Sequence, residues 1–122
     1  RAVDALVNNI DLMPTLLEMA GLPVPEGVQG RSQLSVMRGE AESVQDEIFT
    51  ELKSHRGVIT RDHVYFVDVP TGEYLFDHTV DPAETRNFVT ESSHREVWDA
   101  LRGRLREHLN SYDDPIAQEI PG

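Results

Sequence analysis

The chain has 122 residues, a formal net charge of −11 and no cysteine. This length suits one domain with a modest core, and the lack of cysteine excludes disulfides, thiolate metal sites and a cysteine-derived nucleophile within the chain. The acidic composition excludes nucleic acid and anionic membranes as favoured partners, because both are negatively charged.

The sequence shows neither an apolar run of about 18 residues nor a basic segment followed by an apolar one. No transmembrane span or signal peptide is therefore visible in the sequence. We expect a soluble chain, and the sequence does not indicate its cellular compartment. The chain starts at Arg1 rather than at methionine, which favours a fragment or a processed piece of a longer protein.

The most apolar stretch covers residues 10–21 and predicts a helix over residues 9–20. Its apolar side chains leave almost no polar face, so we expect this helix to be buried. Pro14 falls near the start, where a missing N–H does least damage, and Gly21 is typical of a helix end. A Gly/Pro-rich loop and a short helix before Gly39 follow, so residues 1–46 form a helix–loop–helix lead-in.

A switch to strand-like composition follows the lead-in, over residues 47–77. The runs 47–53, 57–61, 63–69 and 73–77 are rich in β-branched and aromatic residues and are separated by turn signals. Four strands with connections this short predict an antiparallel sheet.

Residues 81–112 predict a short helical turn followed by a C-terminal helix. Asp81-Pro82-Ala83-Glu84 is a helix-start signal, and Ser93 and Glu96 have the spacing of a capping box for a helix over residues 93–110. Five apolar residues share one face of this helix and should lie against the sheet: Val97, Trp98, Leu101, Leu105 and Leu109. Residues 113–122 are expected to form a loose tail.

These elements predict a single α+β domain over residues 1–122. Its centre is a small antiparallel sheet of about four strands, with the C-terminal helix packed across it and the apolar N-terminal helix alongside.

The sequences of four segments match the motifs of a known family, in the same order along the chain. They are Asp11-Leu-Met-Pro-Thr-Leu-Leu-Glu-Met-Ala-Gly-Leu-Pro23, Gly27-Val-Gln-Gly-Arg-Ser-Gln-Leu34, Arg56-Gly-Val-Ile-Thr-Arg-Asp-His-Val-Tyr65, and Tyr74-Leu-Phe-Asp77 with Asp81-Pro-Ala-Glu-Thr-Arg-Asn-Phe88. In order and spacing they resemble the C-terminal part of the sulfatase family, within the alkaline-phosphatase-like superfamily.

The resemblance implies an enzyme that hydrolyses sulfate esters. Sulfatases use a formylglycine made from the first residue of a Cys/Ser-x-Pro-x-Arg motif, beside a divalent metal that is usually calcium. This chain contains no such motif. The nucleophile and the metal ligands are therefore expected upstream, in a missing N-terminal catalytic domain, and the chain alone should bind no cofactor and be inactive.

Two Asp-His dipeptides, Asp62-His63 and Asp77-His78, superficially resemble a metal-binding pair. Neither is followed by glycine, and both fall in the strand region that the resemblance places after the metal ligands. The five histidines also lack the i, i+3 or i, i+4 spacing of a zinc site. We therefore expect no metal site in this chain.

The cluster Lys53, His55 and Arg56 is the remaining candidate site, because it gathers cationic side chains in an otherwise acidic segment. In sulfatases, as the resemblance implies, the C-terminal part lies beside the active-site mouth and its loops help to shape specificity. These three residues are candidates for the substrate cleft. The alternative is a solvated hairpin tip.

The sequence thus favours the C-terminal subdomain or fragment of a sulfatase, which contributes stability and cleft shape. One alternative is the C-terminal part of a phosphonate or phosphodiester hydrolase of the same superfamily. Another is a stand-alone interaction module. In the intact enzyme that the resemblance implies, the N-terminal domain would cover the apolar helix. In the isolated chain its exposed apolar face would favour a homo-oligomer through residues 10–22.

Overall fold

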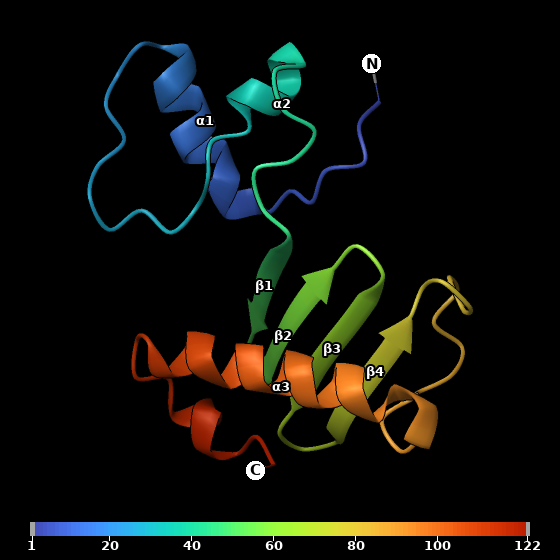
Figure 1. Cartoon of the computed structure of the whole chain (residues 1–122). Helices are drawn as coiled ribbons and strands as arrows, with labels where there is room; N and C mark the ends of the chain where they lie inside the picture. The colour runs from blue at the N-terminus through green and yellow to red at the C-terminus, as the bar shows by residue number, and fades with distance from the viewer. Residues whose placement is uncertain (1, 122) are drawn as a thin grey trace. The chain divides into compact units, whose positions relative to one another are not determined.

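The computed structural model describes residues 2–121. The chain folds as two compact units, Arg1–Ile48 and Phe49–Gly122, where the sequence was interpreted as one domain. Figure 1 shows the elements of both units. Within the described residues, no helix is long and apolar enough to cross a membrane.

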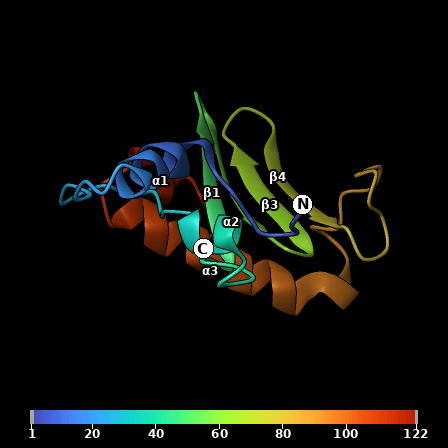
Figure 2. The same cartoon turned by 90° about the horizontal axis from the view of Figure 1, so that it is seen from above.

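The first unit contains two helices. A short 3-10 helix, η1 (Asn9–Asp11), continues into α1 (Leu12–Met19), and α2 (Leu34–Arg38) follows a long loop that is visible in Figure 2. Gly21 and Gly39 follow the two α-helices with φ of 69° and 77°, the left-handed conformation that favours glycine at a helix end. The expected helices and their glycine stops are confirmed.

The apolar face of α1 is exposed in this chain, as expected where no N-terminal domain covers the helix. Leu12, Met13 and Leu16 are 63%, 47% and 54% exposed, whereas the buried residues of α1 are Pro14 and Thr15. Within this unit α1 packs on α2, which has only five residues and is too short to cover an apolar helix on all sides.

Asp11 is the polar centre of the first unit and is only 2% exposed. Its carboxylate accepts hydrogen bonds from the backbone N–H groups of Asn8 and Arg31, both at 2.8 Å, and from the side-chain amides of Gln33 at 3.1 Å and Gln45 at 2.8 Å. Burial opposes ionisation, but these four hydrogen bonds outweigh it and lower the pKa of Asp11. Asp11 therefore joins the start of the first helix to the loops on both sides of α2.

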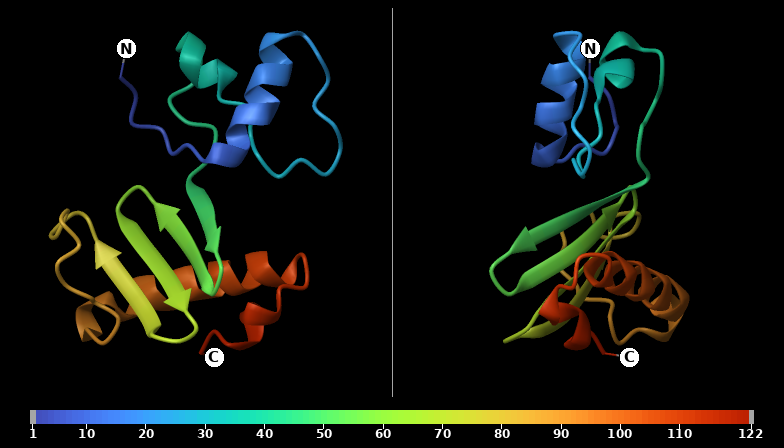
Figure 3. Two further views of the ribbon diagram at one scale, coloured as in Figure 1. Left: turned by 180° about the vertical axis from the view of Figure 1, so that it is seen from behind. Right: turned by 90° about the vertical axis from the view of Figure 1, so that its left-hand side faces the viewer.

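The second unit is built on a four-stranded antiparallel sheet with strand order β1-β2-β3-β4 (Figure 3). The strands are β1 (Glu47–Leu52), β2 (His55–Thr60), β3 (His63–Asp68) and β4 (Gly72–Asp77). In the register Val58 lies opposite Tyr65, which lies opposite Leu75. Each strand lies within about two residues of its expected range, so the sheet prediction is confirmed.

The helix α3 (Arg95–Asn110) runs across one face of this sheet, as the views in Figures 1 and 3 agree. Buried side chains from the strands and the helix form the core: Val58, Tyr65, Val67, Leu75, Leu101, Leu105 and Leu109. Trp98 packs against this core, as expected, and its indole N–H donates to Glu73 at 3.2 Å. The α+β fold class is confirmed.

Residues 81–84 form a hydrogen-bonded turn, and the expected helical turn is wrong. The side chain of Asp81 accepts from Thr85 Oγ1 at 3.0 Å and from the backbone N–H of Arg86 at 2.9 Å, so it stabilises a loop instead of a helix start. Glu84 has a φ of 53°, which does not continue a right-handed helix.

The C-terminal residues are packed, and the prediction of a loose tail over residues 113–122 is wrong. A 3-10 helix, η3 (Pro115–Gln118), follows Asp114, and Ala117 and Ile120 are each only 4% exposed. Arg106 on α3 donates to the carbonyl of Ile120 at 3.0 Å. Two apolar side chains three positions apart thus anchor a segment whose composition is otherwise typical of a loop.

Candidate functional site

The three candidate residues Lys53, His55 and Arg56 lie at the turn between β1 and β2. Lys53 is in the turn itself, and His55 and Arg56 are the first two residues of β2. Consecutive side chains of a strand point to opposite faces of the sheet. The three residues are therefore adjacent in the backbone, but the side chains of His55 and Arg56 lie on opposite faces of the sheet.

Arg56 lies on the face that α3 covers and is 8% exposed. Its Nε donates to Asp114 Oδ2 at 2.6 Å, and its Nη1 donates to the carbonyls of Lys53 at 2.7 Å and His55 at 2.9 Å. Its Nη2 also lies 3.2 Å from a carboxylate oxygen of Glu51. The guanidinium is thus committed to contacts within the protein and braces the turn from inside.

Asp114 is the buried partner of Arg56, with a side chain that is 4% exposed. Burial opposes the charged carboxylate, but the hydrogen bonds from Arg56 and from the backbone N–H of Ile116 outweigh it and lower the pKa of Asp114. The ion pair is therefore charged at neutral pH, and it joins the turn to the start of η3.

His55 lies on the sheet face opposite Arg56 and is half-buried. Its ring stacks on Phe66, with 4.4 Å between centroids, and Phe66 stacks on Tyr74 at 4.7 Å. Burial is the main cause of the lowered pKa of His55; the Arg56 charge also lowers this pKa, and Asp68 opposes both. The imidazole is therefore neutral at pH 7 and serves as a hydrogen-bonding and packing group.

Lys53 supplies the exposed charge of the turn. Its backbone has a φ of 53°, a left-handed conformation that side-chain-bearing residues seldom adopt. No partner for its ammonium group is found among residues 2–121, and its side chain is exposed. The turn can therefore present one cation, on a backbone that Arg56 holds, to an anionic ligand.

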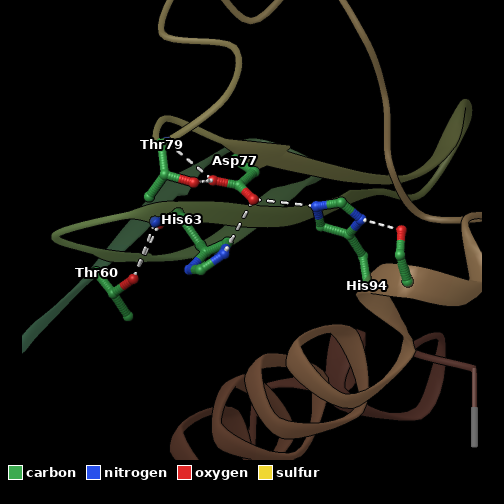
Figure 4. A network of polar contacts seen from close by, with 6 residues as sticks. Thr60, His63, Asp77, Thr79 and His94 are labelled. Carbon is green, nitrogen blue, oxygen red and sulfur yellow. Dashed lines mark hydrogen bonds and ion pairs between the residues drawn. The ribbon is translucent and has the colours of Figure 1, made fainter.

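A second polar cluster surrounds Asp77 at the end of β4 (Figure 4). Asp77 Oδ1 accepts from the backbone N–H of Thr79 at 2.9 Å and from its hydroxyl at 2.6 Å. Asp77 Oδ2 lies 3.0 Å from His94 Nε2 and 3.7 Å from His63 Nε2. The hydroxyl of Ser93 contacts the other nitrogen of His94 at 2.9 Å, so Ser93 serves this cluster instead of capping α3.

The sequence reasoning missed this grouping. It paired Asp77 with the neighbouring His78, which in the structure contacts Glu84 at 2.7 Å. His63 reaches Asp77 because the two residues are opposite one another in the β3–β4 register. His94 reaches it from the 3-10 helix η2 (Ser92–His94), and no local sequence pattern signals a contact across that distance.

Neither cluster fits the calcium ion that the resemblance implies for the intact enzyme. Calcium takes about six to eight oxygen ligands. Asp77 is instead faced by two imidazole nitrogens, and one of its oxygens already accepts two hydrogen bonds from Thr79. Among residues 2–121, no group of three or more acidic or histidine side chains is arranged to hold a metal ion.

Comparisons with known proteins agree with this architecture. Residues 1–111 match the family described as N-sulphoglucosamine sulphohydrolase, C-terminal. An arylsulfatase of Clostridium perfringens is 27% identical over 119 residues, which are 93% of this chain and 25% of that protein. An N-acetylglucosamine-6-O-sulfatase of Bacteroides thetaiotaomicron is 28% identical over 125 residues, which are 90% of this chain and 22% of that protein.

The fold also matches a solved structure of a 2-O GAG sulfatase with a TM-score of 0.81 and 24% identity. That match covers 97% of this chain and 28% of the solved chain. The chain thus spans about a quarter of the length of these relatives. The match over residues 1–111 shows that the chain belongs to the sulfatase family, of which it represents the C-terminal part.

Proposed function

We propose that this chain is the C-terminal subdomain of a sulfuric ester hydrolase and that its β1–β2 turn forms part of the substrate cleft. The family match over residues 1–111 supports the first part. The exposed Lys53, on a braced turn in an acidic chain, supports the second part. The nucleophile, the formylglycine and the calcium site belong to the preceding catalytic domain of the intact enzyme.

The substrate that we propose is a sulfated sugar. Two relatives from Bacteroides thetaiotaomicron are named as an N-acetylglucosamine-6-O-sulfatase and a Delta 4,5-hexuronate-2-O-sulfatase. Such substrates are anionic beyond the reacting ester, so a cation at the cleft wall gains Coulomb attraction to groups that remain after hydrolysis. Lys53 suits this role, while Arg56 holds the turn and the neutral His55 offers a hydrogen bond.

The test uses the full-length protein that contains this chain, with a sulfated disaccharide and with p-nitrophenyl sulfate as a small substrate. Lys53→Ala should raise KM for the disaccharide by about tenfold, the effect of losing one charged contact, and leave the aryl sulfate kinetics unchanged. Arg61→Ala is the matched control, because it removes an exposed cation from the turn at the other end of β2. Equal kinetics for both variants on both substrates would contradict the proposal.

We also infer that the chain alone is inactive. A sulfate ester needs a strong nucleophile and a cation that stabilises the developing charge, and the sequence has no Cys/Ser-x-Pro-x-Arg motif to supply the nucleophile. The purified 122-residue chain should release no p-nitrophenol from p-nitrophenyl sulfate above background at any calcium concentration. Turnover that survives removal of contaminating enzymes would contradict this.

The exposed face of α1 is the surface that we propose for docking onto the rest of the enzyme. A groove of about 350 Å³ lies along it and is lined by Asn9, Leu12, Met13, Leu16 and Leu17. Exposed apolar area costs about 25 cal/mol per Å², so such a face favours coverage. In the isolated chain a second copy of the same helix is the available cover, which supports the expected homo-oligomer through residues 10–22.

A further inference from the structure

We propose that Asp114 is a positioning residue for the substrate cleft, which it shapes by holding Arg56 against the β1–β2 turn. This inference rests on the proposed role of that turn and adds a residue 58 positions further along the chain than Arg56. Asp114 would not touch the substrate. It would act through the guanidinium of Arg56, which in turn fixes the backbone that carries Lys53.

The contacts form a continuous chain from the C-terminal segment to the turn. Asp114 Oδ2 accepts from Arg56 Nε at 2.6 Å, and both side chains are at most 10% exposed. On the far side of the guanidinium, Nη1 donates to two carbonyls of the turn, those of Lys53 and His55. Because the guanidinium is planar and Asp114 holds its Nε, the position of Nη1 against the carbonyls of the turn is fixed as well.

Asp114 is the stronger of the two carboxylate partners of Arg56. The Glu51 side chain is 58% exposed, and an ion pair with an exposed partner contributes little to stability or geometry. The Asp114 pair is buried, where a charge-assisted hydrogen bond is stronger and where loss of either partner leaves an uncompensated charge. Asp114 therefore decides the orientation of Arg56.

Lys53 requires such a brace because of its backbone conformation. A φ of 53° is unfavourable for lysine, and such conformations persist where surrounding contacts over-determine them. The hydrogen bond from Arg56 to the Lys53 carbonyl is a contact of that kind. Without this hydrogen bond the backbone of the turn can relax, and the position of the Lys53 ammonium group is no longer fixed.

The C-terminal segment in turn fixes Asp114. Its backbone N–H donates to the carbonyl of Leu109 at the end of α3, at 3.0 Å, and its Oδ1 accepts from the N–H of Ile116 at 2.9 Å. Ala117 and Ile120 anchor the following residues in the core. The packed C-terminus is therefore the support on which the turn rests.

The experiment compares Asp114→Asn with Asp113→Asn in the full-length protein, using a sulfated disaccharide and p-nitrophenyl sulfate. The Asp114→Asn side chain keeps an oxygen for the Ile116 N–H but presents an amide where Arg56 needs a carboxylate oxygen. Asp113 is exposed and its φ of 58° is one that asparagine tolerates, so Asp113→Asn makes the same charge change without the ion pair. Asp114→Asn should raise KM for the disaccharide about tenfold, with kcat and the aryl sulfate kinetics unchanged, and Asp113→Asn should change neither.

A double variant separates positioning from a merely structural effect. If Asp114 acts on substrate through Lys53, Asp114→Asn should have no further effect on KM in a Lys53→Ala background. Additive effects, or an Asp114→Asn protein that loses stability but keeps its KM, would overturn the inference. If Lys53→Ala itself has no effect on the disaccharide, the proposed function of the turn fails instead.

Arg56→Lys covers the case in which Asp114→Asn does not fold. A lysine ammonium still pairs with Asp114 but lacks the planar fork that also reaches the two carbonyls. It should raise KM for the disaccharide while most of the thermal stability is kept. A normal KM for Arg56→Lys, or loss of the fold in both variants, would assign the pair to folding alone and overturn the inference.

Discussion

Asp77 is the residue whose charge state has the clearest consequence for stability. Its carboxylate has a pKa of about 2, against an ordinary value of 3.8, chiefly because the Thr79 hydroxyl donates to it, with burial opposing and His94 adding a further hydrogen bond. A lowered pKa stabilises the fold above about pH 4, and this contribution is lost as the pH falls towards 2. The difference is worth about 2 kcal/mol of unfolding free energy.

Asp77→Asn should therefore lower the unfolding free energy by about 2 kcal/mol at pH 7 and by almost nothing at pH 2. Urea denaturation followed by circular dichroism at several pH values measures this. Asp62→Asn, at the exposed turn before β3, is the control and should leave the pH profile unchanged. A constant difference between Asp77→Asn and wild type from pH 7 to pH 2 would contradict the account of this cluster.

Gly30 packs directly on the backbone of Ile10. A Cβ at this position would fall 2.0 Å from the carbonyl oxygen of Ile10, and that backbone cannot retreat without moving the adjacent Asp11. Gly30→Ala should cost more than about 2 kcal/mol. Gly103→Ala, on the exposed side of α3 with nothing within 4 Å of its Cβ, should instead stabilise by up to about 1 kcal/mol. Thermal unfolding of both variants measures the contrast, and equal melting temperatures would refute it.

Side-chain direction is a feature of the site that the order of residues in the strand already predicts. His55 and Arg56 are neighbours in a strand, so the pleat alone places them on opposite faces, and only one of them can face a ligand on a given side. The groups around Asp77 were beyond prediction, because His94 meets it through the packing of η2 against the sheet. The Arg56–Asp114 pair spans 58 positions and carries no local signal either.

At the scale of elements, the packing of the C-terminal segment predicts a large loss of stability when its buried side chain is shortened. Ile120 is 4% exposed within the core of the second unit, so Ile120→Ala should cost about 2–5 kcal/mol. Val80→Ala is the control, since Val80 is 66% exposed and its truncation should change the unfolding free energy by less than about 0.5 kcal/mol. Chemical denaturation would measure both changes. An unchanged unfolding free energy for Ile120→Ala would mean that the C-terminal segment is not part of the core.

The strands and α3 could be predicted because their signals are local: alternation in the strands and apolar spacing along the helix. The turn at residues 81–84 could not, because Asp81 caps a loop as readily as it caps a helix. The tail was misjudged because two anchoring residues, Ala117 and Ile120, are too few to make a periodic pattern. The apolarity of α1 predicts that the helix is covered in the intact enzyme, but it does not indicate which surface covers it.

At the scale of the whole chain, the exposed face of α1 predicts self-association of the 122-residue protein. The chain should sediment as a dimer or larger oligomer at micromolar concentration, and Leu16→Glu should make it monomeric by placing a charge on the 54%-exposed apolar face. Val80→Glu is the matched control on the second unit, because Val80 is also exposed but lies outside this face. A wild-type monomer, or dissociation by Val80→Glu as well, would contradict the interface.

The carboxylate of Asp11 has a consequence for folding kinetics. The strands of the sheet pair only with their neighbours along the chain, whereas Asp11 must gather donors up to 34 positions away. Closing longer loops costs more entropy, and contacts between distant residues slow folding. In refolding from denaturant the sheet should therefore form first, with the Tyr65 amide protected from pulse-labelled hydrogen exchange before that of Arg31, which donates to Asp11. Protection in the reverse order would contradict this, since the network around Asp11 is expected to close after the strands have paired.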